Sequence, residues 1–260
     1  MRWIRYEADG GTSYGILEGD EVEEVSGSPF GVHRRTGKHR ALSSVRLLIP
    51  VVPPTFYAAG INYEVHVREA AALLGREPSL PEKPDIGYRA NNALIAHGEP
   101  IVKPRDSGER FQYEGELVVV IGKEAKHLSE AEALSCVFGY TVGNDVSERD
   151  WQAGDLTMWR AKNTDTFKPM GPWIETDASL EAMQTTVRIN GCVVSDFPTN
   201  NMIFGVATYI RAMTRYLTLY PGDIVWMGTD GATQNMKAGD TVEIEISGVG
   251  TLRNPVTAET

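Results

Sequence analysis

The chain has 260 residues, enough to bury one large core, or one core with a small appended domain, without help from disulfides. Its formal net charge of -10 at pH 7 argues against nucleic acid or an anionic membrane as a partner, because both require clustered Lys and Arg. With two cysteines, no apolar run of about 18 residues and no apolar N-terminal segment, we expect a cytoplasmic protein that binds small molecules.

A small β-rich unit is expected at the N-terminus. The stretch YGILEGDEVEEV holds two short alternating runs around a Glu-Gly-Asp turn, which is typical of a tight hairpin. The next stretch, SGSPFGVHRRTGKHR, is predicted to be a loop with His33 and His39 at its surface. Because the Pro-rich IPVVPP marks a boundary, we place a small domain at residues 1–52 and a larger domain at residues 53–260.

Strands outnumber helices in the predicted larger domain. The stretch SEAEALSCVFG is predicted to be a short helix over residues 129–139, because Ser129 and Glu132 have capping-box spacing. A second helix fits residues 201–217, whose apolar residues recur at helical spacing. The stretch VRINGCVVSD predicts a hairpin, since its Asn-Gly pair suits a type I′ turn. This order predicts a mixed α+β class that is mainly β, with antiparallel or mixed sheets.

Two carboxylates stand close together in QYEGELVVVIGK, a predicted strand over residues 112–123. Side chains two apart in a strand face the same way, so Glu114 and Glu116 lie about 7 Å apart on one face. The alternative is a strand at a sheet edge with a polar outer face. If the face is buried, the two charges repel and lose hydration, so raised pKa values or a cation between them are expected. Asp145 ends the next predicted strand and offers a third carboxylate, a set that suits Mg²⁺ or Mn²⁺.

Four segments carry a resemblance to a known family. In order along the chain, YEGELVVVIGK, FGYTVGNDVSERDWQ, RAKNTDTFKPMGPWI and LYPGDIVWMGT are similar to the core motifs of the fumarylacetoacetate hydrolase family, over most of residues 55–256. The resemblance implies a catalytic domain with a mixed β-roll fold, a Mg²⁺ or Mn²⁺ ion and a homodimer. It also implies that Glu114, Glu116 and Asp145 are the ligands of the ion.

A histidine and a glutamate in GINYEVHVREA are candidates for proton transfer. His66 and Glu69 lie at i and i+3, so a helix would place them on one face, within hydrogen-bonding reach. A carboxylate that orients an imidazole makes a general base, although a surface ion contact is the alternative. In the family, the matching His-x-x-Glu lies on a lid helix and is the proposed water-activating dyad. Residues 70–87 are rich in Pro and charge and are predicted to form a mobile cover.

The resemblance assigns further residues around the ion. Lys162 matches a lysine that can stabilise an oxyanion or enolate. Arg149 and Gln152 match positions that contact the substrate carboxylate, and Thr229 matches the threonine of a loop that lines the pocket. Arg89 is a further substrate-binding candidate.

Two departures from the family pattern concern the pocket. Tyr88 and Arg89 stand where the family often has a Phe-Lys pair. After Gly228 and Thr229 the chain reads DGATQNM instead of the common PAGVG, so Asp230 adds a negative charge at the pocket mouth. The substrate therefore does not follow from the family by analogy.

The expected reaction is hydrolytic cleavage of a C–C bond in a 2,4-dioxo acid or acylpyruvate. His66, assisted by Glu69, would take a proton from water, and the resulting metal-bound enolate would be held by the ion and Lys162. Isomerisation of a 2-hydroxyhepta-2,4-diene-1,7-dioate type acid and decarboxylation of an oxaloacetate-like acid use the same enolate and stay open. A catalytically silent binding protein is the non-enzymatic alternative, against which the intact site residues argue.

Overall fold

The computed structural model describes residues 1–73 and 75–260, and the fold is mainly β, as the sequence predicts. The N-terminal strands are β1 (Arg2–Ala8), β2 (Gly11–Glu18), β3 (Glu21–Gly27), β4 (His33–Ala41) and β5 (Arg46–Leu47). The strands up to the middle of the chain are β6 (Phe56–Ala59), β7 (Ile86–Tyr88), β8 (Leu94–Ile95), β9 (Ile101–Lys103), β10 (Phe111–Gln112), β11 (Gly115–Ile121), β12 (Val137–Asn144) and β13 (Ser147–Glu148).

The remaining strands are β14 (Lys168–Glu175), β15 (Gln184–Ile189), β16 (Cys192–Pro198), β17 (Ile224–Trp226), β18 (Thr241–Ile246) and β19 (Gly250–Ala258). The α-helices are α1 (Glu64–Leu73), α2 (Arg149–Gln152) and α3 (Val206–Thr214). None of the helices in the described part of the chain is long and apolar enough to cross a membrane.

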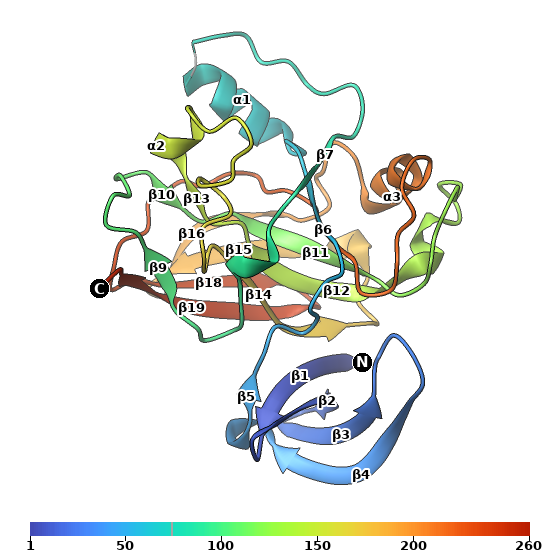
Figure 1. Ribbon diagram of the computed structural model, residues 1–260. Helices are drawn as coiled ribbons and strands as arrows, with labels where there is room; N and C mark the ends of the chain where they lie inside the picture. Colours follow the sequence, from blue (N-terminus) through green and yellow to red (C-terminus); the bar gives the residue numbers. More distant parts are fainter. Residues whose placement is uncertain (74) are drawn as a thin grey trace.

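The N-terminal strands form an antiparallel meander that continues into the main sheet. The predicted hairpin is confirmed as β2 and β3, and Gly19 in its turn has a positive φ of 59°. Strand β1 then pairs with β14, where Trp3 is opposite Ile174. The main sheet has the order β4-β3-β2-β1-β14-β12-β11-β17-β6-β7, so the N-terminal strands extend the sheet that carries the carboxylates (Figure 1).

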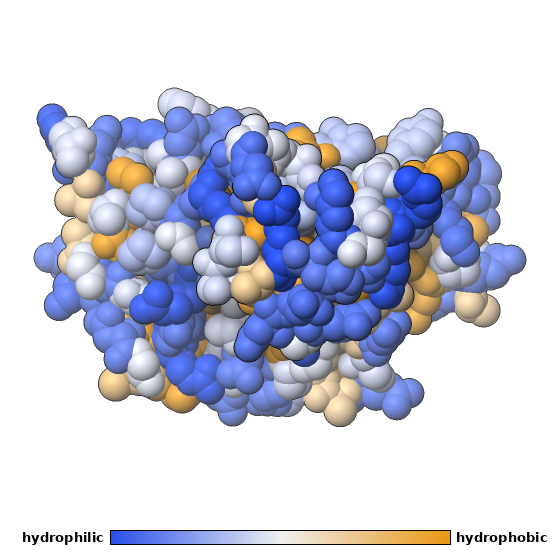
Figure 2. All heavy atoms as spheres, turned by 90° about the horizontal axis from the view of Figure 1, so that it is seen from below, coloured by the Kyte–Doolittle hydropathy of each residue, from blue (hydrophilic) through white to orange (hydrophobic). Residues whose placement is uncertain are grey.

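The sequence predicts a loop after β3, and this prediction is wrong, because most of the stretch forms strand β4. Nearly every side chain of β4 is exposed, including His33 and His39, and among residues 1–73 and 75–260 the strand pairs only with β3. A strand that buries neither face has no alternation of apolar residues to reveal it. Arg35 Nη1 on β4 lies 2.8 Å from Glu23 Oε2 on β3, so cross-strand ion pairs accompany the pairing. Figure 2 shows the side of the molecule where β1 to β4 lie, and it is largely hydrophilic.

A second sheet, of order β16-β15-β18-β19-β9, packs against the main one. Strand β11 approaches it closely at Gly115, where an added Cβ would lie 3.1 Å from methyl carbons of both Val187 and Ile244. The largest cluster of buried apolar side chains contains residues of both sheets, among them Leu117 and Val119 of β11. The glycine between the two glutamates therefore lets one face of β11 meet this core, and the other face carries the carboxylates.

Two predicted helices are shorter in the structure. Over residues 129–139 only a 3-10 turn (Ala133–Cys136) forms, and Val137 already begins β12. The capping contact exists, since Ser129 N donates to Glu132 Oε2 at 3.1 Å, but pairing with β11 takes the residues that would have continued the helix. The helix predicted over 201–217 is α3, and its buried residues include Ile210 and Met213.

The second predicted hairpin is confirmed. Strands β15 and β16 pair antiparallel, and Asn190 and Gly191 between them have φ values of 53° and 80°. Both residues are in the left-handed region that a type I′ turn requires.

Candidate functional site

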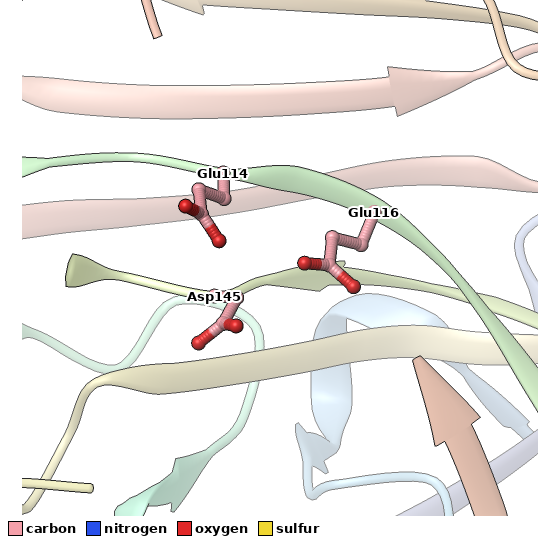
Figure 3. A group of neighbouring side chains, drawn as sticks. All are labelled: Glu114, Glu116 and Asp145. Carbon is pink, nitrogen blue, oxygen red and sulfur yellow. The ribbon is translucent and has the colours of Figure 1, made fainter. Parts of the chain in front are cut away.

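Strands β11 and β12 bring the three predicted carboxylates together. They pair antiparallel with Gly115 opposite Asn144, so Glu114, just before β11, and Asp145, just after β12, come to lie side by side. Asp145 N donates to the backbone oxygen of Glu114 at 2.9 Å. One carboxylate oxygen from each of Glu114, Glu116 and Asp145 lies within 4.8 Å of the others. The three side chains are buried and point toward one another, as Figure 3 shows.

Cationic side chains surround two of these carboxylates. Lys162 Nζ lies 2.6 Å from Glu114 Oε2 and 3.0 Å from Asp145 Oδ2, and thus bridges them. Arg149 Nη2 donates to Glu114 Oε1. Arg89 Nη2 lies 3.1 Å from Asp145 Oδ2. Sequence reasoning selected all of these residues, and the structure places them in direct contact.

The third carboxylate has different surroundings. Glu116 Oε2 accepts a hydrogen bond from Gly228 N at 2.8 Å, and no ion pair joins Glu116 to a Lys, Arg or His among residues 1–73 and 75–260. Burial, together with the charges of Asp145 and Glu114, raises the pKa of Glu116 to about 8. Burial alone would raise the pKa of Glu114 as well, but Lys162 and Arg149 outweigh it and lower that pKa to about 2.

These three side chains could serve as a donor set for a hard divalent cation. All of the donors are carboxylate oxygens, which Mg²⁺ and Mn²⁺ prefer, and a buried anion without a cationic partner is stabilised by a bound cation. Burial also works against the ionised form of Asp145, yet Arg89, Lys162 and Lys168 hold its pKa well below its usual range. Two of the three carboxylates, Glu114 and Asp145, are thus ionised at neutral pH.

His66 and Glu69 project from α1 toward the loop that follows β17. An added Cβ at Gly231 would lie 3.2 Å from His66 Nδ1 and 2.8 Å from Glu69 Oε2, so both side chains face this loop. Burial lowers the pKa of His66, which leaves the imidazole neutral at pH 7. Its Nδ1 is buried and has no hydrogen-bond partner in the described part of the chain. The expected contact with Glu69 is therefore not made here, and the dyad stays a prediction.

The predicted cover over residues 70–87 is described except for Leu74, which lies outside the described residues. Helix α1 supplies its first residues and β7 its last, and residues 75–85 form neither helix nor strand. In Figure 1, α1 and residues 75–85 lie on the side of the molecule opposite to β1 to β4.

The predicted substrate-binding residues lie beside the carboxylates. Arg149 Nη1 donates to Gln152 Oε1 at 2.9 Å, and Arg149 Nε donates to Gln112 Oε1 at 3.0 Å. Helix α2, which carries Arg149 and Gln152, is capped by Glu148, whose Oε2 accepts from Trp151 N at 2.8 Å. Thr229 is buried next to Gly228, whose backbone amide holds Glu116. Their roles toward a substrate stay predictions.

Sequence reasoning missed two groups that position the carboxylates. Lys168 is completely buried at the start of β14, with Nζ 2.6 Å from Asp145 Oδ1, and burial lowers its pKa to about 8. Asn62 donates through Nδ2 to Met227 O at 2.9 Å and so holds the chain just before Gly228. Lys168 could have been found from the sequence, because it is a lysine at the start of an otherwise apolar stretch. No feature of the sequence around Asn62 indicates its role.

Two family models match the chain. The model described as "Fumarylacetoacetate (FAA) hydrolase C-terminal" matches residues 55–257, and "Rv2993c-like, N-terminal" matches residues 1–50. Protein Rv2993c of Mycobacterium tuberculosis is 36% identical over 266 residues, which cover 98% of either chain.

Several solved structures match this chain over its whole length, and two of them are named as isomerases. The 5-carboxymethyl-2-hydroxymuconate delta-isomerase of Mycobacterium smegmatis is similar with a TM-score of 0.90 and 36% identity, and 100% of its own chain is covered. The 2-hydroxyhepta-2,4-diene-1,7-dioate isomerase of Mycobacterium marinum is similar with a TM-score of 0.87 and 35% identity, and 99% of its chain is covered.

Proposed function

The chain belongs to the fumarylacetoacetate hydrolase family, and from this premise we propose that it is a divalent-metal-dependent enzyme acting on 2-oxo acids. The reaction that we favour is hydrolytic cleavage of a C–C bond in a 2,4-dioxo acid. The observation that carries the proposal is the buried cluster of Glu114, Glu116 and Asp145, with Lys162 in contact with two of them. A cytoplasmic location and a homodimer belong to the same proposal.

The ion would be held by the three carboxylates. A bound Mg²⁺ or Mn²⁺ supplies Lewis acidity toward the carbonyl oxygen of a substrate. Arg149 pairs with Glu114 and Arg89 with Asp145, and a guanidinium in this place can also pair with a substrate carboxylate. The ammonium of Lys162 can stabilise negative charge that develops on an enolate oxygen.

His66 would supply the general base. Its imidazole is neutral at pH 7 because burial lowers its pKa, so its free nitrogen can accept a proton from water. The oxygen of that water adds to the carbonyl carbon distant from the substrate carboxylate. The C–C bond then breaks, its electron pair forms the enolate of the smaller 2-oxo acid, and the imidazolium returns the proton to carbon. Glu69 would stabilise the imidazolium when its side chain turns toward it.

An isomerase is the second candidate, because two relatives that cover the chain completely are named as isomerases. Such a reaction needs no water. His66 would remove a proton from one carbon of the substrate and deliver it to another, while Lys162 stabilises the same enolate charge.

The two candidates are separated by one set of incubations. The protein is mixed separately with an acylpyruvate, with a 2-hydroxy-2,4-diene dicarboxylate and with oxaloacetate, in D₂O with Mg²⁺ or with EDTA, and proton NMR follows the products. Cleavage to two acids supports the hydrolase, and movement of a double bond with deuterium uptake supports the isomerase. Release of CO₂ from oxaloacetate would instead indicate a decarboxylase. If none of the three substrates reacts in the presence of Mg²⁺, and Mg²⁺ leaves the melting temperature unchanged, the proposal is refuted.

A further inference from the structure

Asp230 is an acidic residue of the pocket to which the proposed reaction gives no task. It lies on the loop that follows β17, and this loop runs from the carboxylate cluster to the proposed base. At one end of the loop, Gly228 N donates to Glu116 Oε2 at 2.8 Å. At the other end, an added Cβ at Gly231 would lie 3.2 Å from His66 Nδ1. Asp230 stands between these two contacts, and its side chain is half-buried.

No cation balances the charge of Asp230 in the described part of the chain, where its carboxylate takes part in no ion pair or hydrogen bond. Burial raises its pKa from the usual 3.8, but only a fully buried carboxyl shifts far enough to be neutral at pH 7. Burial and the charge of Asp230 also raise the pKa of Glu69, so these two carboxylates are neighbours. Arg68, next to Glu69 in the sequence, donates instead to Glu64 at 2.8 Å. This end of the pocket is therefore acidic.

The other end of the pocket is cationic. Arg149 pairs with Glu114, Arg89 pairs with Asp145, and Lys162 contacts both of these carboxylates. In the proposed reaction the substrate carboxylate lies among these cations, and the carbonyl group that water attacks lies near the imidazole. The part of the substrate beyond that carbonyl group consequently extends toward the acidic end.

A second carboxylate on that part of the substrate would face Asp230 and Glu69. Like charges repel more strongly in a partly buried place than in water, because the effective dielectric constant is lower. The added carboxylate would also lose hydration and find no cation in the described part of this end to replace it. An uncharged end group has neither cost.

We propose that Asp230 is a specificity-determining residue that excludes substrates with a second carboxylate distant from the ion site, so that this chain acts on 2-oxo and 2,4-dioxo monocarboxylic acids. The inference rests on the proposed function, because it requires that the substrate carboxylate occupies the cationic end of the pocket. It adds the chemical class of the other end of the substrate.

The test measures by calorimetry, with Mg²⁺ present, the dissociation constants of 2-oxohexanedioate and of its 6-amide for the wild-type protein, Asp230→Asn and Asp20→Asn. The two ligands have nearly the same shape and differ in the charge of one end group. Asp20 is the matched control, because its exposed side chain lies in the turn between β2 and β3. The wild-type protein should bind the amide on the order of tenfold more tightly than the dicarboxylate. This preference should be lost in Asp230→Asn and kept in the control.

Each outcome decides the question. Equal affinities in the wild-type protein overturn the inference, and so does a preference that survives in Asp230→Asn, since another group would then discriminate. Binding of the amide in either case leaves the proposed function standing. A protein that binds neither compound contradicts both proposals. Circular dichroism shows whether Asp230→Asn is folded; if it is not, Asp230→Ser takes its place, and the affinities of the wild-type protein still decide whether a distant carboxylate is excluded.

Discussion

Glu114 and Glu116 are two residues apart, yet their replacement by Gln should affect the metal-free protein very differently. Glu114 is held by two cations, Arg149 and Lys162, whereas the only described hydrogen bond of the Glu116 carboxylate comes from Gly228 N. Both variants remove a ligand oxygen charge and should therefore weaken metal binding. The melting temperature without metal should distinguish the two residues, because Glu114 pairs with two cations in the metal-free protein, whereas Glu116 has a role only when an ion is bound.

The magnitudes follow from the contacts. Glu114→Gln leaves two buried cations with one anionic partner fewer, and breaking a buried ion pair costs about 3–5 kcal/mol. In a chain of this size each kcal/mol lowers the melting temperature by about 2–4 °C, so a decrease of about 10 °C is expected. Glu116 is already mostly protonated in the metal-free protein at pH 7, since its pKa is about 8. Glu116→Gln keeps its shape and an acceptor for Gly228, so the change should be within about 1 kcal/mol.

Thermal melts followed by circular dichroism at pH 7 test this, first in EDTA and then with excess Mn²⁺. Exposed Glu124 provides the matched control, Glu124→Gln. Mn²⁺ at a hundred times its dissociation constant should stabilise the wild-type protein and the control by about 2.7 kcal/mol, and should stabilise neither site variant by that amount. The reasoning is refuted if the two site variants melt at the same temperature in EDTA, or if Mn²⁺ stabilises Glu116→Gln as much as the wild-type protein.

Three further predictions concern the base, the fold and the assembly. His66→Ala should slow turnover on the order of a hundredfold, and calorimetry should find its Mn²⁺ affinity unchanged. Because burial lowers the pKa of His66, turnover of the wild-type protein should decline only as the pH falls below 6.5, the usual pKa of the imidazole. A decline that begins well above pH 6.5 would contradict the assignment of His66 as the base. Gly115→Ala should cost roughly 1–3 kcal/mol in urea unfolding, since its Cβ would lie 3.1 Å from methyl carbons of the second sheet, whereas Gly31→Ala, with nothing within 4 Å, should be neutral. Light scattering should give twice the chain mass of 28.6 kDa, and a measured mass equal to that of one chain would exclude the homodimer.

The sequence predicted that the three carboxylates lie together, whereas it predicted several of the elements around them less well. The spacing of Glu114 and Glu116 is a local property of an extended chain, so their common face could be inferred before any partner strand was known. The hairpin at Asn190 and Gly191 is equally local. Strand β4 was missed because an exposed strand carries no apolar alternation, and the helix over residues 129–139 was overpredicted because pairing with β11 overrides a capping signal.

What the sequence by itself determined is the common face of Glu114 and Glu116 and the mainly β class, because these follow from the period of a strand and from local turn chemistry. Only the tertiary structure decided that the face is buried, that Arg149 and Lys162 neutralise Glu114, that Glu116 lacks a cationic partner in the described part of the chain, and that Lys168 forms an ion pair with Asp145. The physical reason is that charge and burial at a site depend on residues distant in sequence, such as Lys162 and Gly228. No local pattern around Glu114 or Glu116 specifies which distant groups the fold brings to them.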